Sequence, residues 1–245
     1  TQVDYRTGAL HDMEALTKAA HAKGALVVWD LAHSAGALPV DLAGCDADYA
    51  VGCGYKYLNG GPGAPSFLYV ARRLQAGFVP ALQGWLGHAA PFDFEPGYRP
   101  ADGIRRAIVS TPPILSLAAL ECGVDTLLGW RMADIRAKSE ALTEIFRILV
   151  DSMADRLGLT RASPRDFARR GSQVCYRHEH GYAIVQALAA RRVVGDFRAP
   201  DIMRFGFAPL YVRHVDAWDA AANLVDVIET KAYDDPAFRT RAKVT

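Results

Sequence analysis

The feature that most constrains this chain is an unbroken apolar run, Ala25-Leu26-Val27-Val28-Trp29, which stops abruptly at Asp30. Consecutive apolar residues without polar alternation are typical of a strand buried on both faces of a sheet. The run follows a helical apolar period over residues 12–23, which Asp12 caps and Gly24 ends. A helix followed by a buried strand predicts an open α/β sheet, in which ligands bind at the carboxyl ends of the strands.

The rest of the chain separates into two parts. Two more strands are predicted over residues 48–52 and 66–70, and a helix runs from Thr111-Pro112-Pro113 to about Leu128. A long amphipathic helix over residues 131–157 then leads into shorter elements of a smaller α+β domain. Those elements are strands near 173–178 and 202–207 and helices near 181–191 and 215–231. We therefore expect a large domain over residues 1–130 and a small one over 131–245.

Composition excludes several classes of protein. The 245 residues are 51% apolar and 22% charged with a net charge of +1, so neither disorder nor binding to nucleic acid or a membrane surface is expected. No apolar run approaches the ~18 residues of a membrane span, and the first residues do not resemble a signal peptide. The cysteines form no Cys-x-x-Cys pair and lie in apolar stretches, which predicts small buried hydrophobes in a reducing, cytoplasmic location and no metal site. They are Cys45, Cys53, Cys122 and Cys175.

Asp30 and His33 follow the most apolar strand of the chain, in the segment Asp30-Leu31-Ala32-His33. A carboxylate in that place needs a partner, because an unpaired buried charge is costly. One reading is a helix cap or a turn residue, and the other is an aspartate that faces a cationic ligand nitrogen. His33 has two readings as well, a turn histidine or a group packed on a flat ring.

Lys56 ends another predicted strand, within Gly52-Cys53-Gly54-Tyr55-Lys56-Tyr57-Leu58-Asn59-Gly60. A lysine among aromatic residues and glycines at a strand end is a candidate for Schiff-base formation, with a surface lysine as the alternative. Taken with Asp30, it matches the pairing found in enzymes that use pyridoxal 5'-phosphate (PLP). In those enzymes a lysine binds the cofactor and an aspartate contacts its pyridine nitrogen.

Arg204 lies inside an apolar strand, Met203-Arg204-Phe205-Gly206-Phe207. A guanidinium group in such a strand calls for a bidentate anionic partner, either a structural carboxylate or the carboxylate of a substrate. His178-Glu179-His180 places two imidazoles on one strand face, but two ligands do not make a metal site.

Residues 76–110 are rich in glycine, proline and aromatic side chains and show no clear period. Irregular segments of this length are usually functional. The aromatic side chains of residues 76–112 would form an unusually large apolar patch on a monomer, so we expect an interface between two copies of the chain on this segment and not on the long helix from Arg131. They are Phe78, Trp85, Phe92, Phe94 and Tyr98.

At these residues the sequence resembles the kynureninases, a family of fold-type I PLP-dependent enzymes. The resemblance implies an α/β, transferase-like fold, with a mainly parallel sheet, helices on both of its faces and a smaller α+β C-terminal domain. It also implies that the family's chain begins well before this one, so the sequence is interpreted as a C-terminal portion. The matching stretches are Val3-Asp4-Tyr5-Arg6-Thr7-Gly8, Asp30-Leu31-Ala32-His33, Tyr55-Lys56-Tyr57-Leu58-Asn59, Gln83-Gly84-Trp85, Ser110-Thr111-Pro112-Pro113 and Arg204-Phe205-Gly206.

The resemblance implies an activity and a role for each matching residue. The reaction is hydrolytic Cβ–Cγ cleavage of L-kynurenine, or of 3-hydroxykynurenine, to anthranilate or 3-hydroxyanthranilate and L-alanine, in tryptophan catabolism and NAD biosynthesis. Lys56 resembles the lysine that binds PLP and acts as the base, and Asp30 the partner of the pyridine nitrogen. His33 lies beside the cofactor ring and the substrate, and Tyr55 is a ligand of the phosphate and a proton donor.

Four further positions carry binding roles by the same resemblance. Trp85 and Thr111 resemble residues that reach the cofactor phosphate from the partner subunit, which implies a homodimer with shared active sites. Thr1 matches a hydroxyl that contacts the cofactor, and Arg204 the arginine that binds the α-carboxylate of the substrate. Two alternatives remain: a cysteine desulfurase or selenocysteine lyase of the same fold type, and a non-catalytic fragment.

Overall fold

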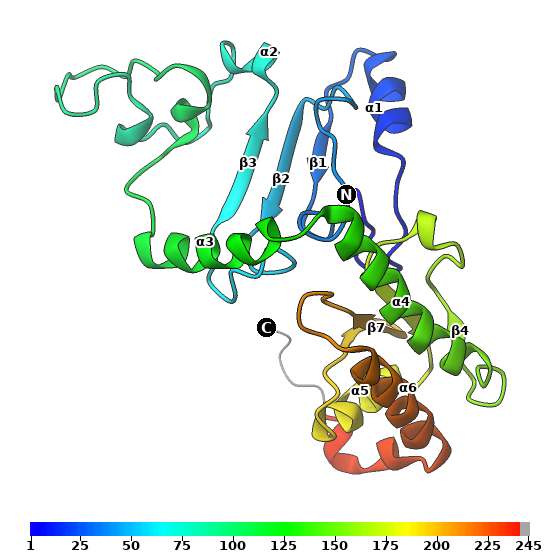
Figure 1. The fold of residues 1–245 in the computed structure, drawn as a ribbon. Coiled ribbons are helices and arrows are strands. Elements are labelled where there is room, and N and C mark those ends of the chain that lie inside the picture. Colours follow the sequence, from blue (N-terminus) through cyan, green and yellow to red (C-terminus); the bar gives the residue numbers. More distant parts are fainter. Residues whose placement is uncertain (241–245) are drawn as a thin grey trace. The chain divides into compact units, whose positions relative to one another are not determined.

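The computed structural model describes residues 1–240, which form two compact units. The first unit consists of residues 1–2, 12–35 and 40–128, and the second of residues 3–11, 36–39 and the chain from Gly129 onward. Figure 1 shows the helices and strands of both. The sequence prediction assigned residues 1–130 to one domain, but segment 3–11 packs with the second unit. The reason is a backbone pairing, in which Leu10 N–H donates to Arg169 O at 2.9 Å and Gly171 N–H donates to Gly8 O at 2.8 Å.

The first unit contains the predicted helix and the three predicted strands. Helix α1 (Met13–His21) begins at the Asp12 side chain, which accepts a hydrogen bond from Ala15 N–H. Strand β1 (Val28–Asp30) pairs in parallel with β2 (Tyr49–Cys53), and β2 pairs antiparallel with β3 (Ser66–Val70). The chain thus supplies a mixed three-stranded sheet in the order β1-β2-β3, whereas a mainly parallel sheet was expected.

The two faces of this sheet differ. On one face Trp29 and Ala50 are buried beneath α1, and Trp29 Nε1 donates a hydrogen bond to Thr17 at 3.0 Å. On the other face Val28 is 61% exposed, and Val51 and Leu68 are exposed as well. The prediction that residues 25–29 form a strand buried on both faces is therefore wrong for this chain. Within residues 1–240, β1 is an edge strand, and only its Trp29 side meets a packed layer.

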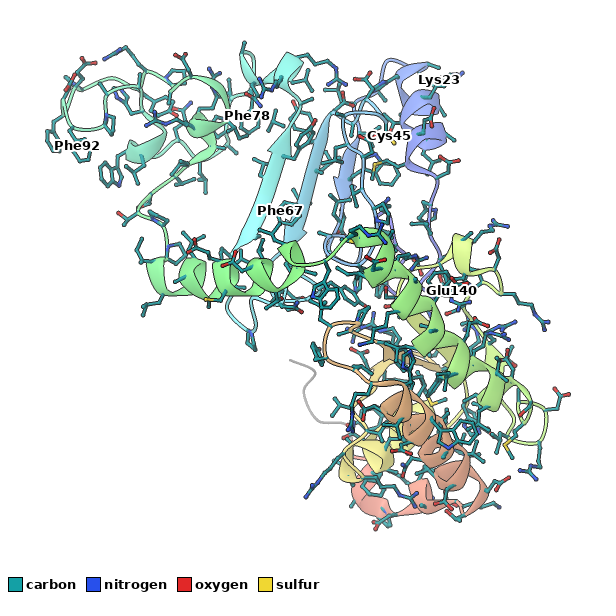
Figure 2. All side chains as sticks on the ribbon, viewed as in Figure 1. Lys23, Cys45, Phe67, Phe78, Phe92 and Glu140 are labelled. Carbon is teal, nitrogen blue, oxygen red and sulfur yellow. The ribbon has the colours of Figure 1, made fainter. Side chains whose placement is uncertain are left out.

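Residues 76–110 contain no α-helix or strand, as the irregular pattern predicted. We call this segment the aromatic lobe. It follows the short helix α2 (Arg72–Gln75), holds the 3-10 turns η1 (Trp85–Gly87) and η2 (Gly103–Ala107), and leads to α3 (Ile114–Leu128). The lobe is fastened by Arg106, which is buried and donates hydrogen bonds to the carbonyls of Ala76, Phe78 and Ala101. Figure 2 labels Phe92, one of its exposed aromatic side chains.

The second unit is an antiparallel sheet with three long helices, as expected for a small α+β domain. Its strand order is β4-β5-β7-β6. The helices pack on one face of the sheet, where Phe146 contacts Phe205 and Phe207 in a continuous core. The elements are α4 (Met132–Asp151), β4 (Thr160–Arg161), η3 (Phe167–Arg169), β5 (Gln173–Arg177), α5 (Gly181–Ala190), β6 (Asp196–Arg198), β7 (Ile202–Gly206), α6 (His214–Glu229), η4 (Ala232–Asp234) and η5 (Pro236–Phe238).

The opposite face of that sheet carries a turn from the start of the chain. Gln173 Nε2 donates to Tyr5 O at 3.3 Å, and Ser163 Oγ donates to Thr7 O at 2.7 Å. Gly8 has a φ of +74°, and a Cβ there would lie 2.8 Å from the Gln173 side chain. We call residues 3–8 the N-terminal strap. Within residues 1–240, no helix has the length and apolar character needed to cross a membrane.

Candidate active site

Asp30 and Lys56 belong to one edge of the first sheet. Asp30 is the last residue of β1, and Lys56 follows the end of the parallel neighbour β2 by three residues. Carboxyl ends of parallel strands meet at the same edge of a sheet, so both residues stand at the edge where α/β folds bind ligands. Asp30 Oδ1 accepts a hydrogen bond from Ala32 N–H at 2.8 Å. The turn role and the ligand role of this carboxylate are therefore compatible, because the turn engages only one of its two oxygens.

Thr1 is brought to the same edge by the backbone. The N–H of Gln2 donates to the carbonyl of Asp30 at 3.0 Å. His33 is placed by the turn after β1, where Ser34 N–H and Ala35 N–H both donate to Leu31 O. Thr1, Asp30 and His33 are thus held in one short stretch of the sheet edge.

The loop that carries Lys56 is closed by backbone hydrogen bonds. Gly60 N–H donates to Gly54 O at 2.9 Å, and Asn59 N–H donates to Lys56 O at 3.0 Å. Lys56 Nζ lies 5.2 Å from the centroid of the Tyr55 ring. Among residues 1–240 no carboxylate lies within ion-pair distance of this amine. A closed loop with an amine that no carboxylate neutralises suits a lysine that reacts with a carbonyl group.

Helix α3 supports this loop, a contribution that sequence reasoning missed. A Cβ on Gly123 would lie 2.6 Å from Leu58 O, so the helix reaches the loop backbone only because this residue is glycine. Asn59 adopts a φ of +59°, and its Nδ2 donates to Thr126 Oγ1 at 3.2 Å. The sequence did contain one signal for this contact. Gly123 lies within a predicted helix, where a glycine often marks a close approach of another part of the backbone.

Cys53 links the Lys56 strand to the Asp30 turn. Its thiol donates to Ala32 O at 3.8 Å, so the side chain spans the two strand ends. The cysteines were predicted to be buried, which holds for Cys175 only. Cys45 and Cys53 are half-buried, and Cys122 is exposed on α3, because that helix leaves much of its apolar surface uncovered in this chain. Burial raises the pKa of Cys175 to about 11, so this thiol is poorly suited to act as a nucleophile.

Trp85 and Thr111 lie at the two ends of the aromatic lobe. Trp85 is exposed at η1 and makes an edge contact with Phe92, with ring centroids 5.7 Å apart. The backbone just before Trp85 packs directly against the carbonyl of Val109, which a Cβ on Gly84 would overlap. Thr111 is exposed just before α3. Within the described chain, no hydrogen bond or ring contact joins either side chain to Lys56 or Asp30.

Arg204 has the bidentate carboxylate partner that its strand position demanded. Its Nε and Nη2 donate to Oδ1 and Oδ2 of Asp196 at 3.2 and 2.8 Å, and Nη1 donates to the carbonyl of Tyr5. The structural salt bridge is thus present, and sequence reasoning missed Asp196. The two residues face each other across the antiparallel pair β6–β7. Arg204 lies in the second unit, so it shares no unit with Lys56 and Asp30.

His178 and His180 form part of an aromatic cluster. His178 Nδ1 accepts from His180 N–H at 3.0 Å, and the His180 ring stacks on Tyr233. Burial and the nearby His180 lower the pKa of His178. Across residues 1–240, no group of three or more His, Cys, Asp and Glu side chains is arranged to hold a metal ion.

Comparison with solved structures defines the class of fold. The apo structure of a cysteine desulfurase from Thermococcus onnurineus NA1 matches with a TM-score of 0.79 at 20% identity, over 94% of this chain and 59% of that one. A variant of C-DES with glycine covalently linked to the PLP cofactor matches with a TM-score of 0.76 at 20% identity, over 92% of this chain and 59% of that one. The chain has the fold of the fold-type I PLP-dependent enzymes.

Comparison of sequences then gives the family to which the chain is most plainly similar among these matches. Residues 135–224 match the family described as "Kynureninase C-terminal domain". The chain is 52% identical over all 245 residues to a kynureninase of Burkholderia mallei (strain SAVP1), and 49% identical over the same length to a kynureninase of Pseudomonas fluorescens. It spans 59% of the length of each of these curated relatives. The resemblance to the kynureninases is therefore confirmed over the whole of this chain.

Proposed function

We propose that the enzyme to which this chain belongs cleaves L-kynurenine, or 3-hydroxykynurenine, to anthranilate or 3-hydroxyanthranilate and L-alanine. One observation carries the proposal: Asp30 and Lys56 stand at neighbouring parallel strand ends in a chain 49–52% identical to kynureninases. The reaction would belong to tryptophan catabolism and NAD biosynthesis. A cytoplasmic location is proposed with it, supported by four free thiols.

The residues at the first sheet edge fit PLP. A carboxylate and an amine stand on adjacent parallel strands, and Gly54 and Gly60 close the lysine loop where a Cβ would meet other atoms within 3 Å. Lys56, Asp30, His33, Tyr55 and Thr1 would hold the cofactor. When bound, PLP supplies an electron sink for the pair left at the substrate Cα.

The chain's own residues then have defined tasks. Asp30 would keep a proton on the pyridine nitrogen by placing a carboxylate beside it. Lys56 Nζ, the amine that would hold the cofactor, would also take the proton from the substrate Cα. Tyr55 is the proposed donor of a proton when the Cβ–Cγ bond breaks after water has added to the γ-carbonyl. Arg204 binds the α-carboxylate and so orients the Cα–H bond.

The nearest alternative is a cysteine desulfurase, suggested by the fold match at 20% identity. A desulfurase needs a mobile nucleophilic cysteine. Cys53 is tied to Ala32 O, Cys175 is buried, and Cys122 is fixed on a helix, so none of these three favours that reaction. The kynureninase proposal is preferred because the identity to kynureninases is more than twice as high.

The test is production of anthranilate by a full-length enzyme. We define the fusion enzyme as Pseudomonas fluorescens kynureninase in which this chain replaces the matching 245 residues. With PLP it should convert L-kynurenine to fluorescent anthranilate and release an equal amount of L-alanine. Release of sulfur from L-cysteine without cleavage of L-kynurenine would favour the desulfurase, and a folded fusion enzyme without either activity would favour the non-catalytic fragment.

We also propose a homodimer whose active sites are shared through Trp85 and Thr111. The aromatic lobe supports this, because Trp85, Phe92 and Phe94 are exposed in one chain. Fusion enzymes carrying Lys56→Ala and Trp85→Ala should regain activity when mixed, since one site of each mixed dimer carries neither change. Activity that stays at the parental level after demonstrated subunit exchange would contradict shared sites.

A further inference from the structure

Arg204 is held by contacts on two sides of its guanidinium group. Asp196 engages the edge formed by Nε and Nη2, at 3.2 and 2.8 Å, and the carbonyl of Tyr5 accepts from Nη1. The side chain retains only 10% of its surface exposed. A guanidinium group has five N–H donors, and these three contacts leave one on Nη1 and one on Nη2. A carboxylate can accept both in a two-pronged geometry.

The partners of Arg204 are themselves fixed. Asp196 Oδ2 also lies 3.1 Å from Arg198 Nη2, so this carboxylate bridges two guanidinium groups. The Tyr5 carbonyl accepts a second hydrogen bond from Gln173 Nε2 at 3.3 Å, on the neighbouring strand β5. Asp4 Oδ1 accepts from the N–H of Arg6 and of Thr7, which shapes the strap that presents the carbonyl. Each contact to Arg204 therefore comes from a group that a second interaction also holds.

The strap is a motif that the proposed function leaves unexplained. Its sequence, Val3-Asp4-Tyr5-Arg6-Thr7-Gly8, contains several polar side chains, yet what it offers Arg204 is a backbone carbonyl. Arg6 adds a guanidinium group close by, since its Nη2 donates to Ala199 O in the turn between β6 and β7. Three guanidinium groups and two carboxylates, those of Asp196 and Asp4, thus share this part of the second unit, and the surplus of positive charge favours an anionic ligand.

We propose that Asp196 and the N-terminal strap are positioning elements for substrate binding. They hold Arg204 so that its remaining Nη1 and Nη2 donors are presented to the α-carboxylate of an amino acid. Asp196 does not compete with that carboxylate, because it uses a different edge of the guanidinium group. This inference rests on the proposed function, in which Arg204 binds the substrate carboxylate.

The first test examines the contact itself in this chain. With [15N]arginine labelling, the Arg204 Nε–H resonance is identified by its loss in Arg204→Lys. Asp196→Asn should accelerate its exchange with water by about tenfold, the factor that corresponds to loss of one net charge-assisted hydrogen bond. Asp201→Asn is the matched control, because Asp201 forms a bidentate pair with Arg177 in the same unit but does not touch Arg204. Equal exchange in Asp196→Asn and Asp201→Asn would overturn the contact.

The second test measures how the fusion enzyme recognises a carboxylate. L-alanine and L-alaninamide are compared by equilibrium binding, because they differ only in the group that Arg204 would bind. Asp196→Asn should reduce the preference for L-alanine and raise the KM for L-kynurenine by roughly tenfold or more, with a smaller change in kcat. Asp196→Glu should recover part of both, and Asp201→Asn should change neither.

The outcomes separate the inference from the proposed function. If the fusion enzyme does not cleave L-kynurenine but Asp196→Asn still lowers the preference for L-alanine, the proposed function fails and the positioning role stands. If Asp196→Asn binds L-alanine more tightly, Asp196 competes with the ligand and the inference is overturned. An unchanged preference in a normally folded Asp196→Asn enzyme would overturn it as well.

Discussion

Asp30 and Arg204 stand in opposite surroundings. Asp30 lies on the sheet face where Val28 and Val51 are exposed, and its carboxylate accepts a hydrogen bond from a neighbour in its own turn. Arg204 lies beneath the N-terminal strap and is held by Asp196 and by a carbonyl more than 190 residues away in sequence. The surroundings match the two proposed roles. Asp30, which is proposed to contact a large cofactor, has exposed surface around it. Arg204, which is proposed to orient a small anion, is held in place by contacts within its own chain.

The largest effect is expected from removing the amine of Lys56 at the edge of the first sheet. Lys56→Ala in the fusion enzyme should lower turnover of L-kynurenine by about a thousandfold or more, because the anchor of the cofactor and the base are lost together. Anthranilate fluorescence measures the rate. Lys23→Ala is the control, since Lys23 is exposed beyond α1 (Figure 2) and should keep the parental rate. Comparable losses in both variants would place the reaction elsewhere.

A smaller but clear loss is expected at Asp30. Asp30→Asn keeps the size of the side chain and the acceptor for Ala32 N–H, so the fold should persist. Without its negative charge the residue no longer keeps the pyridine nitrogen protonated, and turnover should fall by more than about tenfold, or ~1.4 kcal/mol. Steady-state rates and far-UV circular dichroism are compared with those of Asp219→Asn, an exposed aspartate on α6. A rate within tenfold of the parent would remove Asp30 from its assigned role.

The last effect is one on stability, not on turnover, and concerns the second unit. Hydrogen bonds from Arg147 lower the pKa of Glu144 from 4.5 to about 2. Burial of the carboxyl group acts in the opposite direction, and a hydrogen bond from Arg170 lowers the pKa further. Because the folded state depresses this pKa, the stabilisation is fully present above about pH 4.5 and is lost as pH falls through about 2. Glu144→Gln should therefore cost on the order of 2 kcal/mol at pH 7 and little near pH 2.

Urea unfolding of the chain between pH 2 and pH 7 provides the measurement. Glu140→Gln is the matched control, because Glu140 is exposed on the same helix (Figure 2) and its side chain makes no ion pair in the described structure. Parallel stability curves for the parent and Glu144→Gln would show that the network around Arg170 contributes nothing that depends on the charge of Glu144.

The sequence predicted the elements better than their surroundings. The apolar run before Asp30 and the helical periods from Asp12 and Arg131 correspond to β1, α1 and α4. Burial of the run on both faces could not be judged, because burial depends on what covers a sheet and periodicity reports only which side chains could be covered. Exposure of Cys122 on α3 escaped prediction for the same reason.

Contacts between distant segments were the least predictable. Nothing in the spacing of Tyr5 and Arg204 indicates that one accepts a hydrogen bond from the other, since only the folded second unit brings the strap to β7. Asp196 was within reach of sequence reasoning. Ala199-Pro200 is a turn signal between two short strands, and a hairpin centred there places Asp196 opposite Arg204.

Lys56 and Asp30 together form the proposed reaction centre, and borohydride reduction of the PLP-loaded fusion enzyme is the sharpest test of it. Reduction fixes the cofactor on the lysine that binds it, and peptide mass spectrometry locates that lysine. This chain offers six candidates: Lys18, Lys23, Lys56, Lys138, Lys231 and Lys243. We expect the cofactor mass on the peptide that contains Lys56, and we expect it to disappear in Lys56→Ala. Cofactor attached at any other lysine of the enzyme would contradict the assignment of Lys56.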